Sequence, residues 1–235
     1  MAYITIKGDD GEFAAYLASP KPKAGDGQAP GMVVIQEIFG VNAYMRSVCD
    51  RLAERGYLAL CSDLFWRQER GVDITDKTEA EWQKAFELYK GFNEAKGALD
   101  LVATLAHLRG LPSCSGKAGS VGFCLGGKLA YLMATRSNAD CNISYYGVGI
   151  ENALNEAAAI TKPLLMHIAE EDKFVPKEAQ AAIRKSLGTN CAVTIHSYPG
   201  VDHAFARPGG ENWNAAAAEL ANERTDAFLR RHLAP

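Results

Sequence analysis

A cysteine flanked by glycines stands in the segment Gly122-Phe123-Cys124-Leu125-Gly126-Gly127. The segment follows an apolar run and precedes a helical pattern, which is the context of the G-x-nucleophile-x-G turn between a strand and a helix. The glycines let the chain turn sharply and keep side chains out of the crowded junction. Amide groups and the dipole at the helix N-terminus stabilise a thiolate. The pattern predicts that Cys124 is a nucleophile.

An acid and a histidine follow later in the chain, each directly after an apolar run that reads as a strand. The first run leads into Glu170-Glu171-Asp172 and the second into Asp202-His203. The order nucleophile, acid, histidine is that of α/β-hydrolases. We expect His203 to be the base and Asp172 to orient it. Asp172 is preferred to the two glutamates because it lies deeper in the loop, just before a predicted helix.

A fourth candidate segment, Gln36 to Gly40, follows the first long apolar run. An early loop of this kind supplies one backbone N–H to an oxyanion hole, and the residue after the nucleophile supplies the other. We therefore expect the N–H groups of Ile38 and Leu125 to form that pair. Glu37 is then placed beside Cys124.

The sequence resembles the dienelactone hydrolase (carboxymethylenebutenolidase) family over nearly its whole length. The matching segments are QEIFGVN (36–42), GFCLGG (122–127), YYGVG (145–149), EDKFVP (171–176), DHAFAR (202–207) and ANERT (221–225). The resemblance implies one α/β-hydrolase domain over residues 1–235 and a Cys124–Asp172–His203 triad. It also implies that Glu37 takes the thiol proton as substrate arrives. Members of the family open an enol lactone in the bacterial breakdown of chloroaromatic compounds.

The expected substrate pocket departs from the family pattern. We expect Phe39 and Tyr145 to bind substrate. The resemblance implies two arginines and a serine that bind a substrate carboxylate. One arginine is present as Arg207, but Trp82 stands in place of the other and Ala204 in place of the serine. A charge-assisted hydrogen bond worth about 1.5–3 kcal/mol is thereby lost. Three other basic residues could supply the missing cation: Arg67, Arg70 and Lys84.

A cysteine nucleophile restricts the substrate. An ordinary thiol has a pKa of about 8.5, whereas the parent acid of an alkoxide is closer to water, at about 15.7. The tetrahedral intermediate formed from a simple alkyl ester would expel the thiolate and return to the unreacted ester. An enol or phenol leaving group departs readily, so the reaction goes forward. The chemistry therefore favours activated esters. Either Glu37 or His203 forms the thiolate, and we expect His203 to activate water for hydrolysis of the thioester.

The elements that must position these residues alternate along the chain. We expect an N-terminal hairpin (2–7 and 12–18), a surface loop (20–31) and strands at 31–36, 57–61, 117–122, 142–146, 163–168 and 192–198. Helical patterns cover 43–55, 78–109 with a break near Gly91, 126–135, 176–187 and 211–232. Strands separated by helices predict a mostly parallel sheet with helices on both faces. Ligands in such sheets bind beyond the carboxyl ends of the strands, where the candidate residues lie.

Composition narrows the function classes. The 235 residues are 48% hydrophobic and carry a net charge of −3. No basic stripe or long apolar segment occurs, so we expect neither nucleic acid nor membrane as a partner, but a small ester or lactone. The six cysteines show no metal-ligand spacing, and there is no phosphate loop or dinucleotide fingerprint. We expect no cofactor or metal and a cytoplasmic location. The sequence sets no oligomeric state.

Two alternatives stay open at this stage. One is an esterase or thioesterase that acts on a different activated ester with the same residues. The other, from a different class, is a ligand-binding protein with a hydrolase-like fold and no activity. The complete set of Cys124, Asp172 and His203 favours an enzyme.

Overall fold

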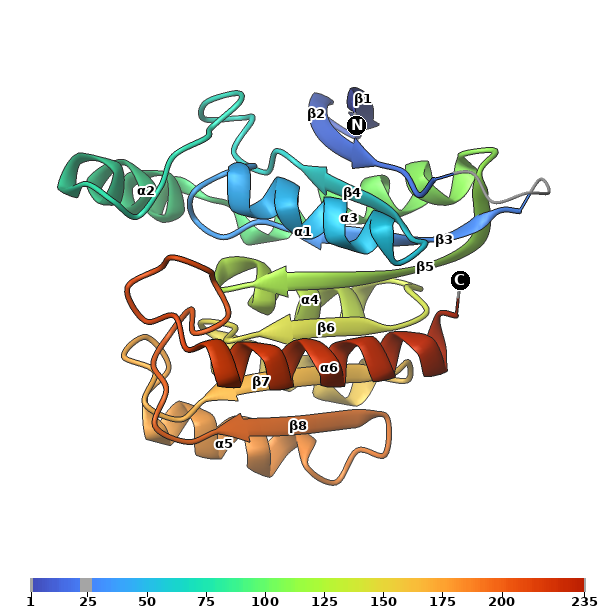
Figure 1. Ribbon diagram of the computed structural model, residues 1–235. Helices are drawn as coiled ribbons and strands as arrows, with labels where there is room; N and C mark the ends of the chain where they lie inside the picture. The colour runs from blue at the N-terminus through green and yellow to red at the C-terminus, as the bar shows by residue number, and fades with distance from the viewer. Residues whose placement is uncertain (1, 22–26, 235) are drawn as a thin grey trace. The chain divides into compact units, whose positions relative to one another are not determined.

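The computed structural model describes residues 2–21 and 27–234. The chain divides into two compact units, the first reaching Gly119 and the second spanning Ser120–Ala234. Each unit contains a four-stranded layer with helices packed against it (Figure 1). The units are therefore described one at a time.

The first unit joins the N-terminal hairpin to the first parallel strand pair. Its strands are β1 (Ala2–Gly8), β2 (Gly11–Ala18), β3 (Ala29–Ile35) and β4 (Leu58–Ser62), in the order β1-β2-β4-β3. β2 pairs antiparallel with both β1 and β4, and β3 pairs parallel with β4. Its helices are α1 (Ala43–Glu54), α2 (Glu79–Gly91) and α3 (Glu94–Gly110). Every residue of β3 is buried, as expected for an apolar strand covered on both faces.

The second unit is parallel throughout. Its strands are β5 (Cys114–Phe123, which begins in the first unit), β6 (Asn142–Tyr145), β7 (Leu164–Ala169) and β8 (Val193–Tyr198), in sequential order. Its helices are α4 (Leu125–Arg136), α5 (Lys177–Leu187), α6 (Ala215–His232) and the 3₁₀ helix η1 (Ile150–Ala159). In Figure 1, α6 crosses in front of β6 and β7, whereas α4 and α5 lie behind the strands. The predicted mostly parallel sheet with helices on both faces is confirmed in this unit.

The predicted break in the long helical pattern is confirmed. α2 ends at Gly91, and the side chain of Asn93 accepts a hydrogen bond from the N–H of Lys96 at the start of α3. An N-cap of this kind starts a new helix by satisfying an N–H group that has no intrahelical partner. Four details differ from prediction: η1 was not expected, β3 begins at Ala29 inside the predicted loop, β5 begins at Cys114 and not at 117, and α6 begins at Ala215 and not at 211. Part of that loop, residues 22–26, lies outside the described residues.

Candidate active site

Cys124 occupies a sharp turn between β5 and α4, in an unusual backbone conformation with φ 57° and ψ −118°. A Cβ on Gly122 would lie 1.9 Å from the carbonyl oxygen of Gly126, and one on Gly127 would lie 2.5 Å from that of Tyr145. Neither position can hold a larger residue without moving backbone. The flanking glycines therefore permit the close approach of strand and helix that the motif predicts.

Backbone hydrogen bonds fix the turn. The N–H of Cys124 donates to the carbonyl oxygen of Tyr145 at 3.1 Å, and the carbonyl oxygen of Cys124 accepts from Gly127 and Lys128 at 2.9 and 3.2 Å. Leu125 is the first residue of α4, so its N–H has no acceptor within the helix. The Cys124 side chain is partly exposed, unlike the four fully buried cysteines Cys49, Cys61, Cys114 and Cys141.

The structure brings His203 and Asp172 together. His203 Nδ1 donates to Asp172 Oδ2 at 2.9 Å, and the two side chains are only 8% and 1% exposed. The other carboxylate oxygen, Oδ1, accepts from the N–H of Phe174 at 2.9 Å. Because Nδ1 is engaged, Nε2 is the ring nitrogen left for the thiol of Cys124, which is the second hydrogen-bond partner of His203.

The charge state of His203 follows from these partners. Burial by itself lowers the pKa of His203, but the negative charge of a Cys124 thiolate and the hydrogen bond to Asp172 outweigh it and raise the pKa to about 10. The set of Cys124, His203 and Asp172 therefore favours the imidazolium form of the buried ring.

Backbone strain is concentrated around this set. Among the described residues, three that are not glycine have positive φ: Cys124, Tyr146 at 38° and Ala204 at 61°. Ala204 follows His203 directly, and the Tyr146 ring lies 5.1 Å from the His203 ring. Strained conformations persist where the surrounding structure enforces them, and they cluster at functional sites.

Two aromatic contacts of His203 were not assigned from the sequence. The Tyr146 ring meets the imidazole edge-on, and so does the Phe174 ring, at 4.9 Å. Phe174 is 45% exposed, so its ring forms an apolar surface beside the histidine. Both residues lie within segments that carry the family resemblance, YYGVG and EDKFVP. Membership of those segments was the sequence signal that could have pointed to them.

The two predicted pocket residues of the second unit differ in their surroundings. Tyr145 is buried, its ring stacks on Phe123 at 4.8 Å, and its hydroxyl lies 2.6 Å from Thr225 Oγ1 on α6. Arg207 is half-buried, and its N–H donates to the carbonyl oxygen of Ala204 at 3.0 Å. The Arg207 backbone is thus tied to the turn that begins next to His203.

The remaining predicted residues belong to the first unit. Glu37 is 1% exposed, and Ile38 and Phe39 next to it are also buried. The Phe39 ring meets the Trp82 ring edge-on at 5.0 Å, and Trp82 stacks on Phe86 at 5.4 Å. The indole N–H of Trp82 donates to the carbonyl oxygen of Asp76 at 3.1 Å. Phe39 and Trp82 therefore form one aromatic cluster.

The three basic residues considered as substitutes for the missing arginine all have partners within the first unit. Arg67 binds Asp10 at 2.5 Å and the buried Asp100 at 2.6 Å. Lys84 pairs with Glu69 at 2.6 Å. Arg70 donates to the carbonyl oxygen of Glu12 at 2.9 Å. These pairings oppose their recruitment to a substrate carboxylate.

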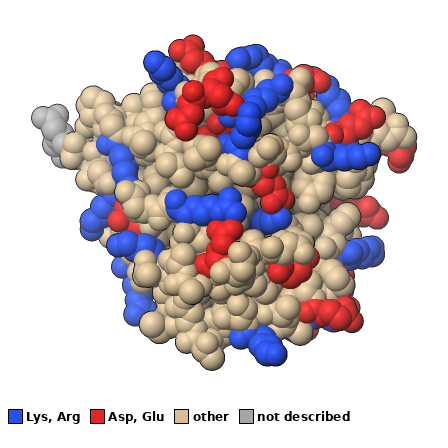
Figure 2. Space-filling model, turned by 180° about the vertical axis from the view of Figure 1, so that it is seen from behind, with Lys and Arg blue, Asp and Glu red and all other residues tan. Residues whose placement is uncertain are grey.

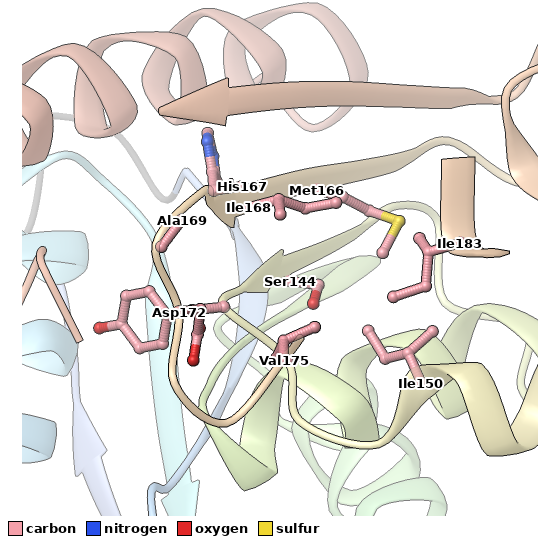
Figure 3. A pocket seen from close by; sticks show the side chains of 11 residues that line it. Ser144, Ile150, Met166, His167, Ile168, Ala169, Asp172, Val175 and Ile183 are labelled. Atoms are coloured by element: carbon pink, nitrogen blue, oxygen red, sulfur yellow. The ribbon is translucent and has the colours of Figure 1, made fainter. Parts of the chain in front are cut away.

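A small cavity of about 10 Å³ lies behind Asp172, between β6, β7, η1 and α5 (Figure 3). The side chains of Met166, Ile150 and Ile183 surround it, whereas the His167 ring points away from it. A volume of this size holds about one water molecule. It is too small for an organic substrate and belongs to the packing that supports Asp172.

The described residues contain no group of three or more His, Cys, Asp or Glu side chains arranged to hold a metal ion. No helix in the described part of the chain has the length and apolar character needed to cross a membrane. Acidic and basic side chains are interspersed on the face shown in Figure 2.

Comparison with known proteins identifies the family of the chain. Residues 13–233 match the family model described as "Dienelactone hydrolase family". The chain belongs to the dienelactone hydrolase family. It is 53% identical over 234 residues to a "Putative carboxymethylenebutenolidase" of Azospirillum brasilense, with 96% of each chain covered. It is 39% identical to the carboxymethylenebutenolidase of Pseudomonas putida, with 96% of this chain and 94% of that relative covered.

A solved structure is similar to this dienelactone hydrolase family member over nearly the whole chain. The "Putative Dienelactone Hydrolase" of Klebsiella pneumoniae is 25% identical and superimposes with a TM-score of 0.84, with 98% of each chain covered. The predicted α/β-hydrolase fold is thereby confirmed. The protein is a hydrolase that acts on ester or lactone bonds, and its family supports hydrolysis of enol lactones.

Proposed function

We propose that this family member opens an enol lactone or a similarly activated ester through a thioester on Cys124. The observation that carries the proposal is the hydrogen bond of 2.9 Å between His203 Nδ1 and Asp172 Oδ2, in a histidine whose second partner is Cys124. That arrangement orients the imidazole beside the thiol, as a nucleophile and base pair requires.

The proposed reaction has two stages. The Cys124 thiolate attacks the lactone carbonyl carbon, and the N–H groups of Leu125 and Ile38 stabilise the oxyanion. The carbonyl re-forms as the bond to the ring oxygen breaks, and the departing enolate takes up the proton that came from the thiol. His203, now neutral, takes a proton from water as the water oxygen attacks the thioester. The C–S bond breaks, the carboxylic acid forms, and the sulfur regains the proton from His203.

The roles of Glu37 and Ile38 rest on the sequence motif QEIFG and the family resemblance. Glu37 is proposed to take the thiol proton as substrate arrives, and it is almost fully buried as such a base must be. His203 is the alternative acceptor. Phe39, Trp82, Tyr145 and Arg207 are proposed to bind substrate. The free thiols of the cysteines are in keeping with the reducing cytosol proposed as the location.

The test is to replace Cys124 by Ala and to compare esters whose leaving groups differ. We expect Cys124→Ala to abolish turnover of an enol lactone and of phenyl esters. Iodoacetamide should modify Cys124 faster than any other thiol, because the neighbouring imidazolium favours its thiolate. Phenyl esters should turn over much faster than alkyl esters of similar size. Retained activity in Cys124→Ala, or equal rates for both ester types, would contradict the proposal.

A general esterase on the same residues is the second candidate. The observation in its favour is the sequence at the two positions of the family's arginines: residue 207 is arginine but residue 82 is tryptophan, so one of the two basic side chains is missing. A neutral phenyl ester that outperforms an anionic enol lactone would favour this candidate.

A further inference from the structure

The loops that carry Asp172 and His203 lie side by side. They follow β7 and β8, which pair in parallel up to Ala169 and Tyr198. The ladder continues one step beyond the strands, because the N–H of Glu170 donates to the carbonyl oxygen of Tyr198 at 3.0 Å. The next bond, from the N–H of Glu171 to the carbonyl oxygen of Val201, is also 3.0 Å. These backbone bonds end one residue short of Asp172.

The carboxylate of Asp202 continues the connection at the point where the backbone ladder stops. Its Oδ1 accepts from the N–H of Lys173 at 3.0 Å and from the N–H of His203 at 2.6 Å. Its Oδ2 lies 2.9 Å from Lys173 Nζ. One oxygen atom therefore holds the backbone beside Asp172 and the backbone of His203 together.

Asp172 and Asp202 cross between the loops in opposite directions. Asp172 reaches from its own loop to the side chain of His203, while Asp202 reaches from the histidine loop to the backbone next to Asp172. We propose that Asp202 is a positioning residue that sets the distance and angle between His203 and Asp172. This inference rests on the proposed function, since it concerns the catalytic roles of those two residues.

The two N–H bonds matter more in this proposal than the ion pair. The side chain of Lys173 is 78% exposed and that of Asp202 only 16%. An ion pair with so exposed a partner contributes little, whereas a displaced catalytic group can cost about 100-fold in rate. An asparagine at position 202 keeps an acceptor oxygen for the two N–H groups and loses the charge. An alanine at this position loses both the acceptor oxygen and the charge.

The experiment compares Asp202→Ala, Asp202→Asn and Lys173→Ala with the wild type, using 4-nitrophenyl acetate as substrate. We expect Asp202→Ala to lower kcat by about 10- to 100-fold and to change KM by less than about threefold, because acetate makes few contacts beyond the reacting centre. Asp202→Asn should restore kcat to within about threefold of the wild type. Lys173→Ala should stay within about twofold.

Two outcomes would overturn the inference. One is a kcat of Asp202→Ala within threefold of the wild type, and the other is an asparagine variant as impaired as the alanine variant. The values of kcat are expressed per folded molecule, from far-ultraviolet circular dichroism. Should Asp202→Ala not fold, Asp202→Ser takes its place, because its shorter hydroxyl cannot reach both N–H groups. We expect its kcat to fall below that of Asp202→Asn, and equality would overturn the inference.

The failure of this inference can be told apart from the failure of the proposed function. Mass spectrometry of the wild type during turnover should show the acetyl group on Cys124. If no acetyl-enzyme forms on Cys124, the proposed function itself is wrong. If it forms and Asp202→Ala is as fast as the wild type, only the role of Asp202 is wrong.

Discussion

Gly122 and Gly126 approach so closely that a Cβ on Gly122 would lie 1.9 Å from the carbonyl oxygen of Gly126. The contact is between backbone atoms of the strand and the helix that flank Cys124, so no side chain can move aside to relieve it. The turn that presents the proposed nucleophile therefore requires a residue without a Cβ at position 122.

Gly122→Ala is expected to destabilise the protein by about 3 kcal/mol, because the added carbon forces β5 and α4 apart. In a chain of this length, that corresponds to a fall in Tm of roughly 6–12 °C. The matched control is Gly110→Ala at the end of α3, where an added Cβ meets nothing within 4 Å. Thermal unfolding checks both variants. If Gly122→Ala and Gly110→Ala have equal Tm values, the turn can widen without a cost in stability.

Cys124→Gly is expected to be more stable than Cys124→Ala by about 1–2 kcal/mol. Residue 124 has φ 57° and ψ −118°, a conformation that is strained for any side chain with a Cβ and accessible to glycine. Both variants lack the thiol, so their difference isolates the backbone strain. Urea unfolding measures it, and a more stable alanine variant would show that the site stores no strain.

The contribution of His203 to the stability of the protein should fall as the pH rises toward 10. The pKa of His203 is about 10 in the folded protein and about 6.5 when unfolded, because the Cys124 thiolate and Asp172 stabilise the imidazolium despite its burial. The His203 imidazole then binds its proton more tightly in the folded state, so the contribution of this group is complete below about pH 6.5 and is lost as the pH rises through about 10.

Urea unfolding of the wild type and of His203→Gln from pH 6 to 10.5 checks this dependence. The advantage of the wild type over the variant should shrink with rising pH. A constant difference across the range would mean that the pKa of His203 is not raised in the folded protein.

Arg207→Ala should raise KM for an anionic enol lactone by roughly 10- to 100-fold, equivalent to about 1.5–3 kcal/mol. A neutral phenyl ester should be nearly unaffected, since it has no carboxylate for the guanidinium to bind. KM is measured for both substrates with the wild type and with Arg207→Ala. If the neutral ester loses as much as the lactone, Arg207 supports the fold of its turn and does not recognise charge.

Trp82→Arg serves as the complementary variant, because it restores the second cation of the family pattern. We expect it to lower KM for the anionic lactone and to leave the neutral ester unchanged. The three basic residues that could replace that cation, Arg67, Lys84 and Arg70, are engaged with Asp10 and Asp100, with Glu69, and with the Glu12 carbonyl oxygen. No improvement for the lactone would show that Trp82 does not occupy the position of that cation.

The sequence by itself determined the features that depend on local geometry. The glycines around Cys124 predicted a sharp turn because only they tolerate the close approach of the two elements. Apolar runs separated by helical patterns predicted parallel strands, and the break near Gly91 was readable from one glycine in a long pattern. The order of Cys124, Asp172 and His203 predicted the α/β-hydrolase fold, and matching segments such as QEIFGVN and GFCLGG predicted the family; both predictions are confirmed.

Only the tertiary structure decided which groups meet across the loops. Asp202 holds the backbone of Lys173 because β7 and β8 are neighbours in the sheet, a pairing of segments far apart in the chain. Tyr146 reaches the His203 ring through a positive φ that its residue type disfavours, and the hydroxyl of its neighbour Tyr145 faces α6. Residue type and spacing specify local conformation, but the partners of a side chain depend on how strands and loops pack in three dimensions.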